Sequence, residues 1–226
     1  EAGALTEVAG AGLKGFAEGL DGNFYGACSG CTSETKVLAL RITKAGSMTT
    51  LAEFTLGPDT DTTVNVVGPM VRGSDGHFYG GWGAGHTGAL FKFTSEGTVT
   101  KLATLAYEAG AYPTSLVRAE DGSFYGVTRS GGANDLGTVF RLVQDGTVEP
   151  VVSLGSTYLA LGGLVEGADG NLYGIAAEVG TQTGSIVRVT PTGTITTLAS
   201  PTLAQGQYLL SLTRGSDDNF YGLALQ

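Results

Sequence analysis

The chain has 226 residues, of which 42% are hydrophobic, so it is long enough to bury a sizeable core. Its formal net charge of −9 argues against nucleic acid and anionic membranes as partners, and no stretch approaches the ~20 apolar residues of a membrane helix. The 38 glycines and the low charged fraction predict short strands joined by tight turns.

The first predicted element is a strand over residues 3–9. Residues 1–8 (EAGALTEV) align with residues 95–102 (SEGTVTKL), in which a glycine turn leads into a strand. Residues 209–226 supply two further strands at the other end of the chain. We therefore expect residues 1–226 to form a single domain in which both ends contribute to one structural unit.

One six-residue phrase, Asp-Gly-x-Phe-Tyr-Gly with small variations, occurs five times. The second position of the phrase advances by 54, 46, 48 and 48 residues. Asp-Gly between apolar runs is a strong hairpin signal, so each phrase predicts a turn between two strands. The period fits one four-stranded propeller blade. The phrase begins at Asp21, Asp75, Asp121, Asp169 and Asp217.

Each repeat unit supplies four predicted strands. An apolar run such as residues 115–117 precedes the turn, and a second strand carries Phe-Tyr-Gly, whose adjacent rings point to opposite faces of the sheet. A glycine turn separates the third strand from a fourth, such as residues 98–102. The third strands lie at residues 39–42, 90–93, 139–142 and 186–189. The sequence thus predicts an all-β, five-bladed β-propeller of mainly four-stranded antiparallel blades.

This phrase and its period resemble the bacterial tandem repeats of about fifty residues known as GloVer repeats, over essentially the whole chain. The resemblance implies a propeller in an exported or surface-anchored protein. A weaker resemblance connects the phrase to tachylectin-type five-bladed lectins, which bind amino sugars. The tryptophan-containing binding segments of those lectins have no counterpart here, because Trp82 is the only tryptophan.

The fifth unit lacks a third strand. In complete units, 16 to 19 residues separate the Phe-Tyr-Gly glycine from the next turn glycine, whereas the two chain ends together offer only six. Three explanations stay open: the N-terminal strand moves inward to give a three-stranded blade, a neighbouring chain or tail donates a strand, or the sequence is part of a longer protein. An unpaired sheet edge invites another strand.

Cys28 and Cys31 form the only Cys-x-x-Cys pair. A zinc site needs further ligands, and the two histidines, His77 and His86, lack metal-ligand spacing. A redox centre usually places this motif at a helix start, whereas here it follows a strand. We favour a small loop disulfide or inert thiols for this pair, with a redox or metal role as the alternatives. We expect no cofactor.

A charged residue stands three positions before each turn aspartate. If the first strands are innermost, these residues form a ring near one mouth of the axial channel, where they pair with each other or hold a polar or anionic ligand. The ring consists of Glu18, Arg72, Arg118, Glu166 and Arg214. The recurring bases of the third strands are predicted to be architectural. They are Arg41, Lys92, Arg141 and Arg188.

The loops between second and third strands vary most between units, and propellers usually bind ligands through such loops. Aromatic and polar side chains there are suited to stacking on a sugar and bonding its hydroxyls. These candidates are Trp82, His86, Arg129, Asn134, Asp135 and Gln182. No unit carries a matched carboxylate pair or a serine–histidine arrangement, so we expect no catalytic residues.

The sequence therefore predicts a secreted or cell-surface binding module, lectin-like in character, whose partner is a glycan or cell-surface polymer. The alternative is a structural protein that self-associates through the incomplete blade. A third alternative is a polysaccharide-active enzyme.

Overall fold

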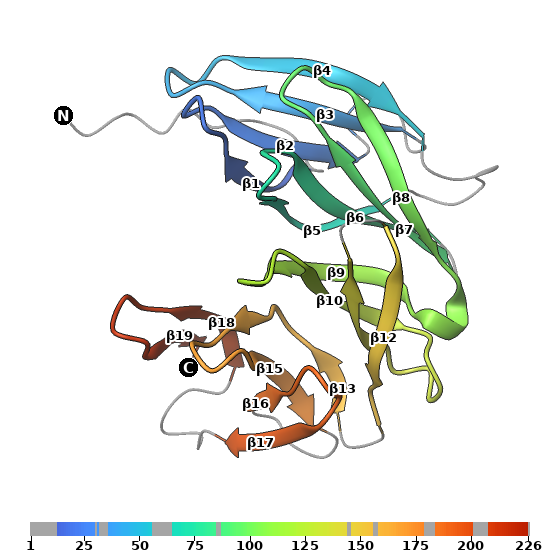
Figure 1. Cartoon of the computed structure of the whole chain (residues 1–226), viewed down its shortest axis with the longest axis vertical. Helices are drawn as coiled ribbons and strands as arrows, with labels where there is room; N and C mark the ends of the chain where they lie inside the picture. Colours follow the sequence, from blue (N-terminus) through green and yellow to red (C-terminus); the bar gives the residue numbers. More distant parts are fainter. Residues whose placement is uncertain are drawn as a thin grey trace.

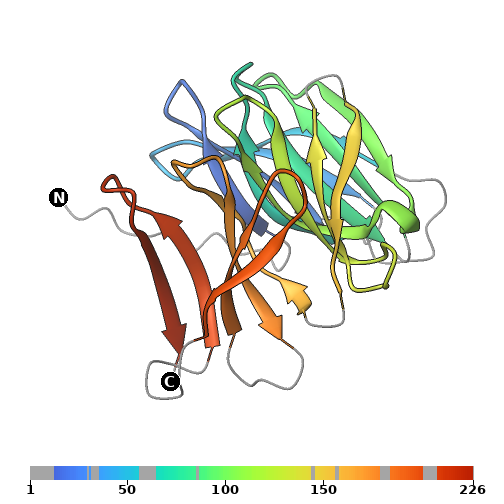
Figure 2. The same cartoon turned by 60° about the horizontal axis from the view of Figure 1, so that its bottom comes forward.

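The architecture is a set of antiparallel sheets arranged around a common centre (Figures 1 and 2). A computed structural model describes residues 13–29, 31, 36–55, 65–84, 87–143, 146–155, 158–178, 184–200 and 208–225. The described residues are all-β apart from one short 3-10 helix, η1 (Tyr107–Ala109). In the four larger sheets the first strand lies nearest the centre and the last strand lies at the periphery.

Each sheet corresponds to one repeat unit and is called a blade. Blade 1 has the strand order β1 (Leu13–Glu18), β2 (Phe24–Ser29), β3 (Val37–Ile42) and β4 (Met48–Phe54). Blade 2 has the order β5 (Asn65–Arg72), β6 (Phe78–Ala84), β7 (Thr87–Phe93) and β8 (Val99–Leu105). Blade 3 contains β9 (Ala111–Arg118), β10 (Phe124–Ser130), β11 (Thr138–Leu142) and β12 (Val148–Ser153).

The last two blades depart from this pattern. In blade 4 the first strand is split into two segments, which both pair with the second strand. Blade 4 contains β13 (Tyr158–Leu161), β14 (Val165–Glu166), β15 (Leu172–Glu178), β16 (Gly184–Val189) and β17 (Ile195–Ala199). Blade 5 is a two-stranded sheet of β18 (Tyr208–Arg214) and β19 (Phe220–Leu225). The predicted strand at residues 3–9 lies outside the described residues.

The five turns form as the Asp-Gly phrases predict. In the first turn the Gly19 amide donates to the Asn23 carbonyl and the Gly22 amide donates to the Gly19 carbonyl. The second position of each turn has a positive φ, which glycine adopts without strain. In blade 5 this position is Asp218, with a φ of 63°, and aspartate is among the residues that tolerate this region best.

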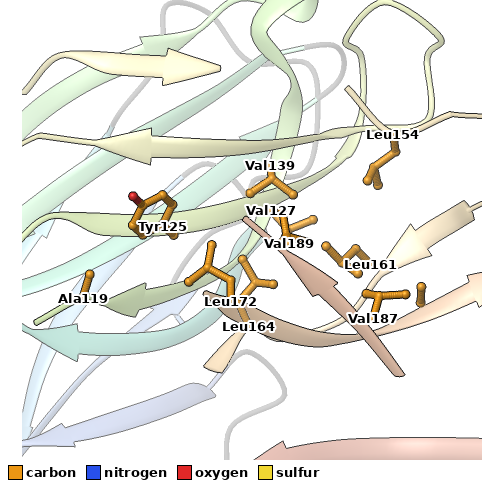
Figure 3. Packing of buried hydrophobic residues seen from close by; sticks show 11 residues of the cluster. Ala119, Tyr125, Val127, Val139, Leu154, Leu161, Leu164, Leu172, Val187 and Val189 are labelled. Atoms are coloured by element: carbon orange, nitrogen blue, oxygen red, sulfur yellow. The ribbon is translucent and has the colours of Figure 1, made fainter. Parts of the chain in front are cut away.

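Packing between blades relies on the two adjacent rings of the second strand. Tyr25 stacks on Phe78 of blade 2 with ring centroids 4.2 Å apart, and Tyr79 stacks on Phe124 of blade 3 at 4.3 Å. Between blades 3 and 4 the partner of Tyr125 is Leu172, and both belong to the buried cluster drawn in Figure 3. Each blade therefore covers its neighbour with the same pair of positions.

In the part of the chain that the structure describes, the ring of blades is not closed. Phe24 at the start of the series is 37% exposed, and Tyr221 at its end is 54% exposed, although the equivalent Tyr25 is only 1% exposed. Phe24 belongs to the first blade and Tyr221 to the last, at the two ends of the interblade series.

The glycine of Phe-Tyr-Gly provides a test of this packing. A Cβ on Gly126 would lie 2.8 Å from the Ser115 carbonyl oxygen and would collide with the Phe140 ring. We expect Gly126→Ala to lower the free energy of unfolding by about 1–3 kcal/mol, which is typical of overpacking. Urea denaturation measures this loss. Gly163→Ala is the control because a Cβ there meets nothing within 4 Å, and an equal loss in both variants would contradict the packing argument.

Candidate functional site

Each turn aspartate anchors its own hairpin. Asp21 accepts hydrogen bonds from the Asn23 amide at 3.1 Å and from the Tyr25 hydroxyl at 2.8 Å. The same tyrosine bond, at 2.8 Å, is made in blades 2, 4 and 5. Buried tyrosines need such a partner for the hydroxyl, so the aspartates have a structural role.

The third residue of the phrase controls what the opposing base does. Where it is asparagine, its side chain occupies Oδ2 of the aspartate, as Asn23 does on Asp21 at 2.6 Å. Arg41 then has a buried Nε without a hydrogen-bond partner among the described residues. Where the third residue is Ser123, the aspartate is available and Arg141 bonds Asp121 at 2.7 Å.

Blade 4 follows the same rule, whereas in blade 2 the base keeps its aspartate although His77 Nδ1 also lies 2.8 Å from Asp75 Oδ2. In blade 4, Asn171 bonds Asp169 at 2.6 Å, and Arg188 also has a buried Nε without a partner in the described part of the chain. In blade 2 the third residue is His77, and Lys92 bonds Asp75 at 3.1 Å. Asparagine at this position thus leaves the base without the aspartate as its partner.

Arg41 lines a cavity of about 750 Å³ between blades 1 and 2. The turns of both blades contribute to it, since Asp21 and Leu20 come from the first turn and Asp75 and His77 from the second. Its other lining residues are Gly19, Tyr25, Leu51, Gly76, Phe78, Ser95 and Glu96. Charged, hydroxyl and aliphatic groups therefore converge on one concave site.

The carboxylates of this cavity favour the ionised form. The hydrogen bond from Tyr25, with further bonds from Asn23, lowers the pKa of Asp21 despite some desolvation. Burial opposes ionisation of Asp75, but bonds from Tyr79, the His77 amide and Lys92 outweigh it and lower its pKa. Bonds from Ser95 and Thr94 lower the pKa of Glu96. The cavity thus holds three negative charges at neutral pH.

The predicted loop residues do not gather into this site. The Trp82 side chain is 3% exposed and packs in the core between blades 1 and 2, so it has no open ring face for stacking and its predicted place in a ligand site is wrong. Asn134 donates to the Leu154 carbonyl at 3.0 Å, and Asp135 accepts from the Gly131 amide at 3.1 Å and from the Tyr107 hydroxyl. These bonds order their own loop.

Of the three other loop candidates, Arg129 lies within the described residues. Arg129 is exposed, and it does not line the cavity between blades 1 and 2. His86 and Gln182 lie outside the described residues.

The five charged residues of the predicted axial ring occupy equivalent positions at the ends of the innermost strands. Glu18, for example, lies opposite Phe24, as Arg72 lies opposite Phe78. Arg214 contacts Glu120 at 3.8 Å and Asp218 at 2.5 Å. The remaining members are Arg118 and Glu166.

Glu166 differs from the cavity carboxylates. Burial raises the pKa of Glu166, and the nearby charges of Glu120 and Asp121 raise it further, although its carboxylate accepts a bond from the Glu120 amide at 2.8 Å. Its side chain lines a second cavity, of about 480 Å³, between blades 3 and 4.

The cysteine pair lies at the end of β2. The Cα atoms of Cys28 and Cys31 are 6.0 Å apart and the two sulfur atoms are placed as a disulfide. Among the residues that the structure describes, no group of three or more histidine, cysteine, aspartate and glutamate side chains is placed to hold a metal ion. No helix in the described ranges has the length and apolarity to span a membrane.

Arg41 and His77 are site residues that the sequence did not single out. Arg41 belongs to a set of recurring bases, which favoured an architectural role for all four. Asn23 distinguishes Arg41 from Arg141. The Asn23 side chain binds Oδ2 of Asp21, whereas in blade 3 this aspartate oxygen is bound by Arg141. The spacing of the repeats does not predict that the turns of two successive blades line one cavity.

Comparison with known proteins places this architecture in a family. The family model described as the Gloeobacter/Verrucomicrobia repeat matches residues 13–226. No curated protein matches the chain.

Several solved structures have a similar fold. A protein of unknown function from Bacteroides caccae is 10% identical with a TM-score of 0.58, over 93% of this chain and 69% of that one. An exo-β-1,3-galactanase from Clostridium thermocellum is 12% identical with a TM-score of 0.59, over 94% and 54%. An oligogalacturonate lyase is 13% identical with a TM-score of 0.58, over 96% and 66%. The chain thus spans just over half to about two thirds of these structures, and the likeness shows the propeller fold alone.

The turn aspartates predict how stability depends on pH. All five have a lowered pKa in the folded chain, so folding favours their ionised form. This stability is present above the unfolded pKa of about 3.9 and is lost as the pH falls through the lower folded values. We expect the unfolding temperature to be steady between about pH 5 and 7 and to fall below about pH 4, as measured by calorimetry. An unfolding temperature that rises on acidification below pH 4 would contradict this assignment.

Proposed function

Since the chain belongs to the Gloeobacter/Verrucomicrobia repeat family, we propose that it is an extracellular, non-enzymatic binding module that holds a sugar in the cavity between blades 1 and 2. The single observation that carries the proposal is that Arg41 lines this cavity while its buried Nε has no hydrogen-bond partner among the described residues. A buried donor without a partner is costly, so the guanidinium gains free energy if it turns to donate to a ligand oxygen.

The chemistry of the lining favours a polyhydroxylated ligand. Carboxylates accept hydrogen bonds from sugar hydroxyls, and Arg41 donates to a ring or hydroxyl oxygen. Leu20 and Leu51 supply aliphatic surface for the apolar face of a sugar ring. Because Asp21, Asp75 and Glu96 are ionised, the cavity favours a neutral or amino sugar over an anionic one.

The same carboxylates support binding without hydrolysis. Canonical glycoside hydrolysis uses one carboxylic acid with a raised pKa as proton donor and one carboxylate as base or nucleophile. All three cavity carboxylates instead have a lowered pKa, so none is a suitable donor at neutral pH. The similar galactanase and lyase act on carbohydrates, but identities of 12% and 13% do not transfer an activity.

The cysteine pair supports an extracellular location. Disulfides persist mainly in oxidising compartments, and the two cysteines have the Cα separation of a disulfide, 6.0 Å.

Isothermal titration calorimetry against neutral and amino-sugar oligosaccharides tests the proposal. We expect Arg41→Gln to weaken binding about tenfold, the loss of one charge-assisted hydrogen bond. Arg188→Gln is the matched control, because this arginine also has a partner-free buried Nε but does not line the cavity. Asn23→Ser should weaken binding as well, because it frees Asp21 to pair with Arg41 as Asp121 pairs with Arg141.

Three outcomes would overturn the proposal. Absence of saturable binding to any sugar class removes the lectin-like function, and equal affinities for the Arg41→Gln and Arg188→Gln variants move the ligand elsewhere. Polysaccharide cleavage that is lost in Glu166→Gln would establish an enzyme instead, because Glu166 has the raised pKa that a proton donor requires.

A further inference from the structure

The free edge of β19 distinguishes blade 5 from the other blades. In blades 1 to 4 the second strand is paired on both sides, whereas among the described strands β19 pairs only with β18. A two-stranded sheet is marginally stable in water, and its unpaired backbone groups form a template for another strand. The chemistry of the missing neighbour can be read from the complete blades.

The residues opposite the second strand follow one pattern in all four complete blades. A basic residue always lies opposite the tyrosine, and apolar residues lie opposite the positions on either side of it. The tyrosine pairs are Tyr25↔Arg41, Tyr79↔Lys92, Tyr125↔Arg141 and Tyr173↔Arg188. In blade 1 the flanking pairs are Phe24↔Ile42 and Gly26↔Leu40.

The base has an electrostatic role at that position. Burial raises the pKa of each of the four paired tyrosines. The positive charge of the facing lysine or arginine lowers that pKa and so reduces the rise. In blade 5, Asp217 accepts bonds from the Tyr221 hydroxyl and from Asn219, as the aspartates of blades 1 and 4 do, but no basic residue of the described strands lies opposite Tyr221. A cation placed opposite Tyr221 would complete the arrangement that the other blades share.

In blades 2 and 3 the third strand also fills space above the glycine. Rings of β7 and β11 lie over Gly80 and Gly126, so that a Cβ on Gly80 would lie 3.1 Å from the Phe91 ring and a Cβ on Gly126 would lie closer still to Phe140. Among the described residues, the atoms nearest to Gly222 belong to Ser211 and Leu212 of β18. A large apolar side chain opposite Gly222 would reproduce the arrangement of blades 2 and 3.

We propose that β19 binds an extended segment of another repeat of this type, antiparallel, with a lysine or arginine opposite Tyr221 and apolar residues opposite Phe220 and Gly222. Residues 1–12 contain no lysine or arginine, so they do not match this pattern. A second copy of the chain is a poor donor, because β3, β7, β11 and β16 are each already paired on both sides. The edge thus selects a strand that is not engaged in a blade of its own.

The probe is a synthetic peptide of residues 184–200, which form the third and fourth strands of blade 4. Blade 4 is a suitable donor because, like blades 1 and 5, it has asparagine at the third position of its phrase. Fluorescence anisotropy with the full chain should show saturable binding. The Arg188→Glu peptide should bind at least about fivefold more weakly, since it places a second carboxylate near Asp217, which binds the Tyr221 hydroxyl.

Hydrogen exchange and matched protein variants locate the bound peptide. We expect protection of the amides at residues 220–225, and weaker peptide binding by the Asp217→Asn protein. Asp169→Asn is the control, because its blade already contains Arg188 and should bind the peptide as the unaltered chain does.

Four results would overturn the proposal. The first two are no saturable binding of the peptide and equal affinity of the chain for the two peptides. The third is amide protection confined to β4, β8, β12 or β17. The fourth is a concentration-dependent dimer of the chain that the peptide does not dissociate. Sugar binding at Arg41 is measured separately and is independent of these results.

Discussion

The interblade contact of the Phe-Tyr pair is the interaction on which the rest of the structure depends. The tyrosine of one blade packs on the first ring of the next, as in Tyr25–Phe78 at 4.2 Å and Tyr173–Phe220 at 4.3 Å. Such a contact requires the phenol to be buried, and burial requires a partner for its hydroxyl. The turn aspartate supplies that partner in most blades, so the turn and the core are one unit.

The candidate binding site follows from a small variation within that unit. The aspartate has a limited number of acceptor sites, and a third-position asparagine uses Oδ2 together with the tyrosine. The base opposite the tyrosine then lacks a partner on its own blade, as Arg41 and Arg188 show. Arg41 lines a cavity that the turn of the next blade completes. One residue therefore distinguishes the proposed binding position from the architectural ones.

These relations explain what the sequence predicts well. The phrase and its period establish the blades, since adjacent rings on a strand must point to opposite faces and both faces must be covered. The Asp-Gly turns follow in the same way, and even Asp218 adopts the glycine-like φ of its position. The site was not predictable to the same extent. Trp82 stood in a variable loop but packs in the core, while Arg41 looked architectural because its type recurs in every complete blade.

The open ends of the propeller involve two separate physical requirements. Tyr221 and Leu223, with exposed fractions of 54% and 67%, present apolar surface on a face of blade 5, and a neighbouring blade would bury it. Among the described strands, β19 has an unpaired backbone edge, and a further strand would pair with it. Phe24 is the exposed counterpart of Tyr221 in the interblade series. A third strand widens the face that Tyr221 presents, and a wider face buries more apolar area against its neighbour. Strand addition therefore favours closure of the ring, although neither event alone satisfies both requirements.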